Sequence, residues 1–472
     1  MDTEEFKDFA QSMAEFIGNY LDNIRERRVL PEVEPGYLRP LLPETAPEDG
    51  ERWQALMGDL ERVIMPGVTH WHHPQFHGYY PTAQSYPAIV ADMLSGGIAC
   101  IGISWITSPA CTELEMVVLD WLGKMIDLPV EFLSCSNGKG GGVIQSTASE
   151  STLIALLSAK AKYLSRAKEL EPDQPEGVLT SKLVGYCSDL AHTSVNRAGL
   201  LGGIKMRGVA AGDDYRLRGE ALRKAIREDK EAGRIPFFAV ATLGTTVNCA
   251  FDDLDEIGTV CVEEDLWLHV DAAYAGAAFI CPEFRHLMRG IEKADTFNFN
   301  PHKWMLVNFD SAAMWFKDAS YMINTYGNDP VYLKHEHQGV PDYRHWQIPF
   351  GRRFRSLKLW FVLRIYGVKG LQAHIRKQVA LAKQFEGLVL QDNRFELFCP
   401  ASMGLVCFRL KGSNETNELL LKKINANGKI YMVPSKIKET YFLRMVVCSR
   451  FCQPTDMELA FNEVSSIASE LQ

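Results

Sequence analysis

Hydrophobic residues recur at three- and four-residue steps near the start of the chain, and this spacing predicts an amphipathic helix. The members of this apolar stripe are Phe6, Phe9, Met13, Phe16, Ile17, Tyr20 and Ile24. Three phenylalanines on one face must be covered, either by the rest of the chain or by a second subunit. A Pro-rich stretch follows between Pro31 and Pro47, and a helix ahead of such a stretch can reach across an interface.

Between about residues 140 and 320, short apolar runs alternate with helical patterns. This alternation predicts an α/β fold with a mostly parallel sheet and helices on both faces. The runs cover residues 183–187, 237–242, 266–270, 296–299 and 312–316. Because ligands of such sheets bind at the carboxyl ends of strands, the residues to inspect are 189–192, 244–246, Asp271 and 300–303.

The remaining segments suggest how the chain divides into domains. Residues 322–345 carry scattered Gly and Pro among polar residues, which predicts a long, mobile surface loop. The C-terminal region mixes a helix over 371–390 with strands over 405–410 and 442–448. We therefore expect a helical dimerisation segment (1–85), a large α/β domain (86–360) and a smaller C-terminal α+β domain (361–472).

Composition and charge narrow the classes of function. The 472 residues are 46% hydrophobic and 23% charged, as in globular proteins. A formal net charge of −9 argues against a general affinity for nucleic acid or anionic membrane, and no apolar run approaches the roughly 20 residues of a membrane helix. The eleven cysteines include no Cys-x-x-Cys pair, so we interpret them as reduced thiols of a soluble, cytoplasmic protein.

The Gly-rich run over residues 138–142 matches neither a P-loop nor a dinucleotide fingerprint, and alone it predicts a plain turn. The run Ser146-Thr147-Ala148-Ser149 follows it and leads into a helical pattern. Ser or Thr is a favourable helix N-cap, and the free N–H groups of a helix N-terminus form a phosphate site.

Asp271 and Lys303 each follow a predicted strand. A carboxylate there could bind a metal ion, a magnesium nucleotide or a buried cation. However, no second carboxylate adjoins Asp271 and the P-loop is missing. Burial lowers the pKa of a lysine and frees its amine to attack a carbonyl. Pyridoxal phosphate needs an amine for its aldehyde, a carboxylate for its ring N–H and a phosphate cradle, so the combination indicates this cofactor.

A His-rich run holds His70, His72, His73 and, slightly later, His77. No carboxylate or cysteine is interleaved, so aromatic packing around a pocket is favoured over a metal site. The aromatic residues of this stretch are Trp71, Phe76, Tyr79 and Tyr80. His335 and His337 are expected to be solvated.

Four motifs together are highly specific: SPACTELE at 108–115, HVDAAYAG at 269–276, FNPHKW at 299–304 and HWQIP at 345–349. With them, essentially the whole chain resembles the group II pyridoxal-phosphate decarboxylases. Within that group it is most similar to the aromatic-L-amino-acid (DOPA) decarboxylases, particularly those of insects. The resemblance implies the PLP-dependent transferase-like fold (fold type I) and a homodimer with active sites at the interface.

The resemblance also implies roles for individual residues. Lys303 binds the cofactor covalently, Asp271 pairs with its ring N–H, and His192 stacks on the ring. Ala148, Ser149 and Asn300 hold the phosphate, and Thr246 and His302 belong to the same cofactor site. Tyr332, on the predicted loop, protonates the substrate carbon after carbon dioxide leaves. The substrate side is formed by Trp71, Tyr79, Tyr80, Thr82, His192 and Gly351, together with Ile101 and Ile103 from the partner subunit.

Departures from the family pattern keep alternatives open. Tyr80 stands where most DOPA decarboxylases have Phe, and Ile103 where the vertebrate ones have Phe. Related insect enzymes that turn DOPA into its aldehyde tend to carry Tyr at the position of Tyr80 but Asn at that of His192. Retention of His192 and Tyr332 favours decarboxylation of L-DOPA, and of 5-hydroxytryptophan as a further substrate.

Gly351 separates the chain from histidine decarboxylases, which have Ser there, although Ser146-Thr147 is more typical of them. Aldehyde synthesis and histidine decarboxylation therefore stay as alternatives. A glutamate decarboxylase would need cationic residues in place of the aromatic stretch. A binding protein without activity would not need to retain Lys303 and Asp271.

Overall fold

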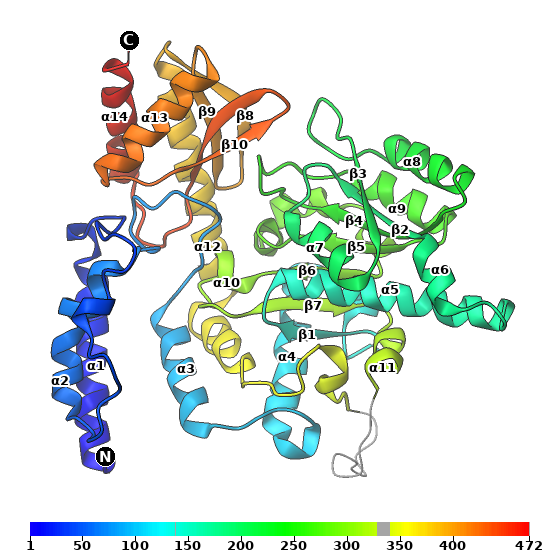
Figure 1. The fold of residues 1–472 in the computed structure, drawn as a ribbon, viewed down its shortest axis with the longest axis horizontal. Coiled ribbons are helices and arrows are strands. Elements are labelled where there is room, and N and C mark those ends of the chain that lie inside the picture. The colour runs from blue at the N-terminus through cyan, green and yellow to red at the C-terminus, as the bar shows by residue number, and fades with distance from the viewer. Residues whose placement is uncertain (137, 328–339, 472) are drawn as a thin grey trace. The chain divides into compact units, whose positions relative to one another are not determined.

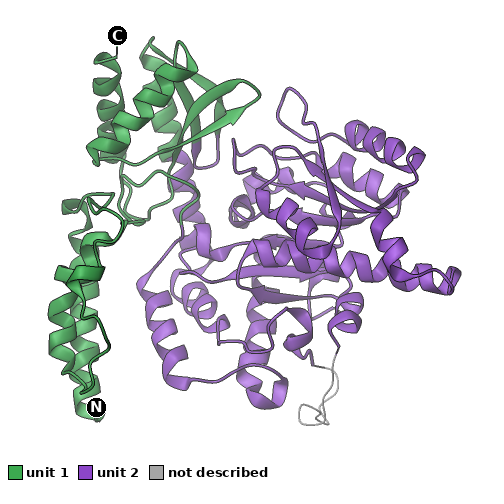
Figure 2. Cartoon of the chain, in the orientation of Figure 1, with its two compact units in different colours: residues 1–81, 381–401, 406–472 green, residues 82–380, 402–405 purple. Residues whose placement is uncertain are grey.

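The structure, a computed structural model, describes residues 1–136, 138–327 and 340–471. They form two compact units, each of them discontinuous in sequence (Figure 2). The first unit comprises residues 1–81, 381–401 and 406–472, and the second comprises 82–380 and 402–405. Among the described residues, no helix combines the length and apolarity that crossing a membrane requires.

The first unit joins the start of the chain to its end. The predicted amphipathic helix is α1 (Thr3–Asp22), capped by the Asp2 carboxylate, which accepts a hydrogen bond from the Glu5 N–H at 2.9 Å. The ring of Phe9 in α1 stacks on Trp53 of α2 (Trp53–Asp59), with the ring centroids 5.2 Å apart. The side chain of Phe6, in contrast, is 52% exposed. The apolar stripe is therefore only partly covered by its own chain.

The C-terminal region contributes a four-stranded sheet of order β10-β11-β9-β8, covered by α13 (Asn414–Asn427) and α14 (Pro454–Ser469). The strands are β8 (Phe395–Ser402), β9 (Leu405–Leu410), β10 (Val433–Ile437) and β11 (Thr440–Val446). The strand predicted over 405–410 is confirmed as β9. The N-terminal segment is bonded to this region, because His77 Nδ1 lies 3.0 Å from the Val446 carbonyl and Gln75 Nε2 donates to the Asp456 carbonyl at 3.0 Å.

The second unit is built on a seven-stranded sheet of order β1-β7-β6-β5-β4-β2-β3 (Figure 1). Its strands are β1 (Gly141–Gln145), β2 (Leu183–Ser188), β3 (Lys205–Val209), β4 (Ile235–Thr242), β5 (Trp267–Asp271), β6 (Thr296–Phe299) and β7 (Ala312–Phe316). Strands β2 to β6 pair in parallel, while β7 is antiparallel to both β1 and β6. The prediction of a mostly parallel sheet in an α/β fold is confirmed.

Helices cover both faces of this sheet. The connection from β2 to β3 through α7 (Thr193–Gly202) runs toward one edge. The connections through α8 (Gly219–Glu231) and α9 (Leu254–Glu263) run the other way. Because such crossovers are right-handed, α7 lies on one face and α8 and α9 lie on the other. The long helix α5 (Ala148–Leu170) packs beside α7.

The other helices of this unit are α3 (Tyr86–Ile98), α4 (Pro109–Met125), α6 (Glu176–Lys182), α10 (Pro301–Trp304), α11 (Ser320–Tyr326) and most of α12 (Ser356–Gln391). The backbone of α12 is interrupted at Gly367, which has non-helical dihedral angles.

Two predictions about this unit are wrong in part. The Gly-rich run does not end as a turn, because Gly141 and Gly142 belong to β1. A Cβ atom on Gly142 would lie 2.9 Å from the Leu119 Cβ of α4, so glycine allows this helix to pack against the strand. The segment 322–345 is not all surface loop either, because α11 extends to Tyr326, and Tyr343 and Arg344 are buried. Residues 328–339 lie outside the described part of the chain.

Candidate active site

Lys303 is held beside the end of strand β5. Strand β6 ends at Phe299, and the chain turns through Asn300 into α10, where the Lys303 N–H donates to the Asn300 carbonyl at 2.9 Å. The Asn300 N–H donates in turn to the carbonyl of Ala273, two residues beyond Asp271, at 3.0 Å. A backbone hydrogen bond therefore joins the segments that follow β5 and β6. The side chain of Lys303, in the second of these segments, is half-buried.

Asp271 is a buried carboxylate with spare hydrogen-bonding capacity. It is 4% exposed and pairs in the sheet with Thr242 on one side and Asn298 on the other. Its Oδ1 accepts from the Ala273 N–H at 3.0 Å, and among the described residues no further donor is bonded to the carboxylate. Since a buried charge is costly unless it is paired, this carboxylate is suited to a cationic or N–H group of a ligand.

His192 is the N-cap of α7, and its Nδ1 accepts from the Ser194 N–H at 3.2 Å and lies 2.8 Å from the Ser194 Oγ. This arrangement assigns the ring proton to Nε2. Partial burial lowers the pKa of His192, the nearby Asp271 charge raises it and the Lys303 charge lowers it further. The imidazole is therefore neutral near pH 7 and shares the electrostatic neighbourhood of Asp271 and Lys303.

The N-terminus of α5 has the donors of a phosphate cradle. Thr147 is the N-cap, as predicted for this position, and its hydroxyl accepts from the Glu150 N–H at 3.3 Å. The N–H groups of Ala148 and Ser149 belong to the first turn, where a helix offers them no acceptor. Asn300 adds a buried side-chain amide, whose Nδ2–H groups can donate to a phosphate oxygen. These groups fit the phosphate of the cofactor that the sequence predicts.

A backbone hydrogen bond brings Thr82 close to His302. The Ala83 N–H donates to the His302 carbonyl at 2.6 Å, which places Thr82 next to the short helix that carries Lys303. The His302 Nδ1 accepts from the Ser311 N–H at 2.9 Å, so the imidazole must be neutral. Burial and then the Lys303 charge lower the pKa of His302 to about 3.

Thr246 is half-buried and follows the turn at the end of β4. The Leu243 N–H donates to the Asp271 carbonyl at 2.9 Å, so this turn starts alongside Asp271. Gly244 has a φ of 89°, and a Cβ atom there would lie 2.6 Å from the Ala275 Cβ. Only glycine therefore allows the turn to approach the segment that follows β5.

Ile101, Ile103 and Gly351 form a second group in the same unit. The Gly102 N–H donates to the Arg352 carbonyl at 2.9 Å, and a Cβ atom on Gly351 would lie 3.7 Å from the Ile101 Cγ2. Ile101 is 54% exposed and Gly351 is exposed as well. The structure thus brings these predicted substrate residues together on an open surface.

Trp71, Tyr79 and Tyr80 belong to the other compact unit. Trp71 stacks on Phe76 and on Tyr79, with centroid separations of 4.9 and 5.5 Å, which confirms the predicted aromatic packing. Sequence reasoning missed Tyr431, whose hydroxyl lies 3.0 Å from that of Tyr79, because nothing local to Tyr431 marks it as a neighbour. Tyr332, the predicted proton donor, lies outside the described residues, as do His335 and His337.

The His-rich run contributes to packing. His73 and His77 are 5% and 0% exposed, and burial lowers the pKa of each to about 4. No group of three or more His, Cys, Asp or Glu side chains in the described part of the chain is placed to hold a metal ion. Eight of the eleven cysteines are buried, in line with the interpretation of them as small apolar residues.

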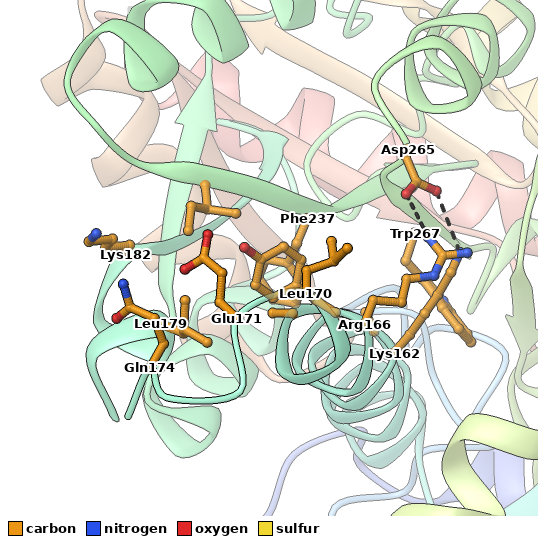
Figure 3. Close-up of a pocket in the computed structure, with 14 residues that line it drawn as sticks. Lys162, Arg166, Leu170, Glu171, Gln174, Leu179, Lys182, Phe237, Asp265 and Trp267 are labelled. Atoms are coloured by element: carbon orange, nitrogen blue, oxygen red, sulfur yellow. Dashed lines mark hydrogen bonds and ion pairs between the residues drawn. The ribbon is translucent and has the colours of Figure 1, made fainter. Parts of the chain in front are cut away.

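A pocket of about 330 Å³ lies at the amino ends of β4 and β5 (Figure 3). Asp271 is at the other end of β5. Its charged groups largely pair with one another, since Arg166 lies 2.6 Å and Lys162 lies 3.9 Å from the Asp265 carboxylate. None of the predicted site residues lines this pocket. The candidate site is therefore the opposite, carboxyl edge of the sheet.

Comparison with known proteins identifies the family of this chain. The model of the pyridoxal-dependent decarboxylase conserved domain matches residues 35–411. An aromatic-L-amino-acid decarboxylase of Drosophila melanogaster is 67% identical over 473 aligned residues, which cover 100% of this chain and 92% of the relative.

Solved structures match along the whole chain as well. Oryza sativa TDC with PLP and tryptamine superposes with a TM-score of 0.96 at 34% identity, covering 100% of this chain and 99% of that one. Rhodiola rosea 4-hydroxyphenylacetaldehyde synthase gives 0.93 at 36% identity with the same coverage. These matches along the whole chain show that it belongs to the family of pyridoxal-dependent decarboxylases and that it uses pyridoxal phosphate.

Proposed function

We propose that this enzyme decarboxylates aromatic L-amino acids, L-DOPA and 5-hydroxytryptophan among them, to the corresponding amine and carbon dioxide. The observation that carries the proposal is the meeting of Lys303, Asp271 and Asn300 at the carboxyl edge of the sheet. The 67% identity to an aromatic-L-amino-acid decarboxylase over the whole chain supports the class of substrate.

Pyridoxal phosphate, when bound, supplies a ring that can withdraw the electrons of the bond to the leaving carbon dioxide. We assign Lys303 to the covalent attachment of its aldehyde and Asp271 to the ring N–H, because that carboxylate is buried with hydrogen-bonding capacity to spare. The neutral imidazole of His192 would stack on the ring of the bound cofactor. The N–H groups of Ala148 and Ser149 and the amide N–H groups of Asn300 would bind the phosphate, with Thr246 and His302 at the edge of the same site.

The substrate side is assigned to Thr82 and to the aromatic group of Trp71, Tyr79 and Tyr80, whose rings suit an aromatic side chain. None of these residues is cationic, which disfavours an acidic substrate. Tyr332 is assigned to the protonation of the substrate carbon after carbon dioxide leaves. Gly351 and the isoleucines 101 and 103 complete the substrate side of the partner subunit's site.

We infer that the enzyme is a homodimer and that it works in the cytosol. In support of a dimer, α3 carries large apolar side chains that are at least 41% exposed, and it leads directly to the exposed Ile101. These side chains are Tyr86, Val90, Met93, Leu94 and Ile98. The many buried thiols are compatible with a reducing compartment.

A second candidate function is the oxidative conversion of L-DOPA to 3,4-dihydroxyphenylacetaldehyde. It is favoured by Tyr80 and by the likeness to a solved 4-hydroxyphenylacetaldehyde synthase. His192 and Tyr332 favour simple decarboxylation. Histidine decarboxylation is the third possibility, supported by Ser146-Thr147 and opposed by Gly351.

One product assay separates these functions. The purified enzyme with pyridoxal phosphate is given L-DOPA, 5-hydroxytryptophan, tyrosine or histidine in an oxygen-electrode cell, and carbon dioxide, amine, ammonia and peroxide are measured. We expect equimolar carbon dioxide and amine from L-DOPA without oxygen uptake. Ammonia and peroxide as main products would establish the aldehyde synthase instead, and a preference for histidine in competition would establish the histidine decarboxylase.

A further inference from the structure

A buried ion pair joins α4 to the segment that follows the predicted loop. Glu115 and Arg352 have side chains that are each 2% exposed, and Arg352 Nη2 donates to Glu115 Oε1 at 2.5 Å. Arg352 Nε also donates to Gln347 Oε1 at 2.9 Å, and the guanidinium lies 4.5 Å from the centroid of the Tyr343 ring. The pair is thus fixed on several sides, as a buried pair must be to offset its lost hydration.

This pair takes the place of a neighbouring strand along β1. Among the described strands, β1 is at the edge of the sheet and pairs with β7 alone. The N–H and C=O groups of its alternate residues therefore point away from β7 and need other partners. The Ile144 N–H donates to Glu115 Oε1 at 2.7 Å, and the Ile144 carbonyl accepts from Arg352 Nη2 at 3.2 Å. Two residues earlier, the Gly142 carbonyl accepts from the Tyr343 hydroxyl at 2.9 Å.

The same arginine reaches the substrate side. The backbone carbonyl of Arg352 accepts a hydrogen bond at 2.9 Å from the N–H of Gly102, which stands between Ile101 and Ile103. Arg352 also directly follows Gly351 in the sequence. Ile144 lies only four residues before Ala148, the first residue of the phosphate-binding helix α5. Arg352 therefore contacts two elements. Its side chain contacts β1, which leads to the predicted phosphate cradle, and its backbone contacts the loop of predicted substrate residues.

We propose that Glu115 and Arg352 are positioning residues that hold the phosphate cradle and the 101–103 loop in a fixed relation to each other. The proposal rests on the proposed function, because the roles of Ala148, Ser149, Ile101 and Ile103 belong to it. Loss of the pair shifts β1 at its open edge and the loop at Gly102 together, so binding of cofactor and binding of substrate change in the same variant.

The test compares wild-type enzyme with Arg352→Met, Arg352→Lys and Glu115→Gln. Cofactor affinity is measured by titrating apoenzyme with pyridoxal phosphate, and KM and kcat for L-DOPA are measured at saturating cofactor. We expect Arg352→Met to weaken cofactor affinity about 10-fold or more and to raise KM several-fold. The cofactor affinity and KM of Arg352→Lys should lie between those of the wild type and those of Arg352→Met. An ammonium group can pair with Glu115, but it lacks the planar guanidinium that also reaches Gln347 and Ile144.

Arg207→Met is the matched control. Arg207 also pairs with a buried carboxylate, that of Asp229, but on β3 and α8 at the other end of the sheet. Its loss should lower the thermal midpoint and leave cofactor affinity and KM unchanged. If folded Arg352→Met and Glu115→Gln retain the wild-type cofactor affinity and KM, or if Arg207→Met changes them equally, the positioning role is refuted.

Two further outcomes are separable. Should Arg352→Met fail to fold, the lysine and glutamine variants decide the question by the same two measurements, and wild-type values in both refute it. A wild-type enzyme that released no carbon dioxide from aromatic amino acids would refute the proposed function. Its cofactor titrations would still report on the ion pair.

Discussion

At the scale of single residues, the candidate site is marked by polar groups that the fold buries without satisfying. Asp271 receives one backbone hydrogen bond from the described residues, and the Asn300 Oδ1 receives none from them. Leaving such groups unpaired costs about 1–3 kcal/mol each, and more for a charge. Under the proposed function, the bound cofactor completes the bonding of these two side chains.

Replacing Asp271 by asparagine tests this interpretation. The amide has the same shape but lacks the negative charge that stabilises a protonated ring nitrogen. We therefore expect kcat for L-DOPA to fall by about 100-fold or more in a folded protein. Carbon dioxide release at saturating pyridoxal phosphate measures the effect. The matched change Asp265→Asn, at the opposite edge of the sheet beside Arg166, should leave kcat within about 2-fold. Equal activity of the two variants would contradict the assignment.

At the scale of elements, the sequence predicted strands best where they are buried on both faces. The apolar runs over 296–299 and 312–316 match β6 and β7 to the residue, because every side chain there is buried. Strand β3 was missed, since it lies at the sheet edge and most of its side chains are at least partly exposed. The glycines of β1 were misread because they serve close packing against α4, which no local pattern reveals.

Some residues of the candidate site could be predicted from the sequence, and others could not. Asp271 and Lys303 could be predicted because ligand-binding residues follow strand ends, and this order is visible in the sequence. The contact of Tyr79 with Tyr431 could not be predicted, since it joins residues 352 positions apart through tertiary structure alone. Likewise, the motif around Glu115 gave a family likeness but no indication that its carboxylate completes a strand edge.

The turn after β4 makes a prediction at this scale. Gly244→Ala adds a Cβ atom both at a positive φ and 2.6 Å from the Ala275 Cβ, so we expect a loss of about 2–4 kcal/mol in the free energy of unfolding. Gly203→Ala is the control, because Gly203 also has a positive φ but open space around it, and it should cost about 1 kcal/mol. Denaturant unfolding followed by circular dichroism compares them, and equal losses would show that the contact at Ala275 is relieved.

At the scale of the whole molecule, the exposed apolar face of α3 requires cover. Val90 and Met93 are both 54% exposed and lie on the helix that leads toward Ile101. A continuous face of this kind is typical of a subunit interface. Under the proposed function, the interface also carries the isoleucines of one subunit to the active site of the other.

The double variant Val90→Lys, Met93→Lys should therefore convert a dimer into a monomer, because two ammonium groups would have to be buried in an apolar contact. Light scattering after size exclusion measures the mass, and we expect decarboxylase activity to fall to about a tenth or less with it. The control Leu200→Lys, Leu201→Lys changes two exposed leucines of α7 and should preserve mass and activity. A fully active monomer would contradict the shared site.

The composition of the first compact unit has a consequence for how the protein is made. Residues 1–81 are synthesised before the C-terminal region, yet Gln75 and His77 form hydrogen bonds with Asp456 and Val446. At roughly 5–20 residues per second, those partners are synthesised on the order of 20–70 s later. During that interval Gln75 and His77 lack these partners, although α1 can already pack against α2 through Phe9 and Trp53. The first compact unit can therefore be completed only after the C-terminal region has been synthesised.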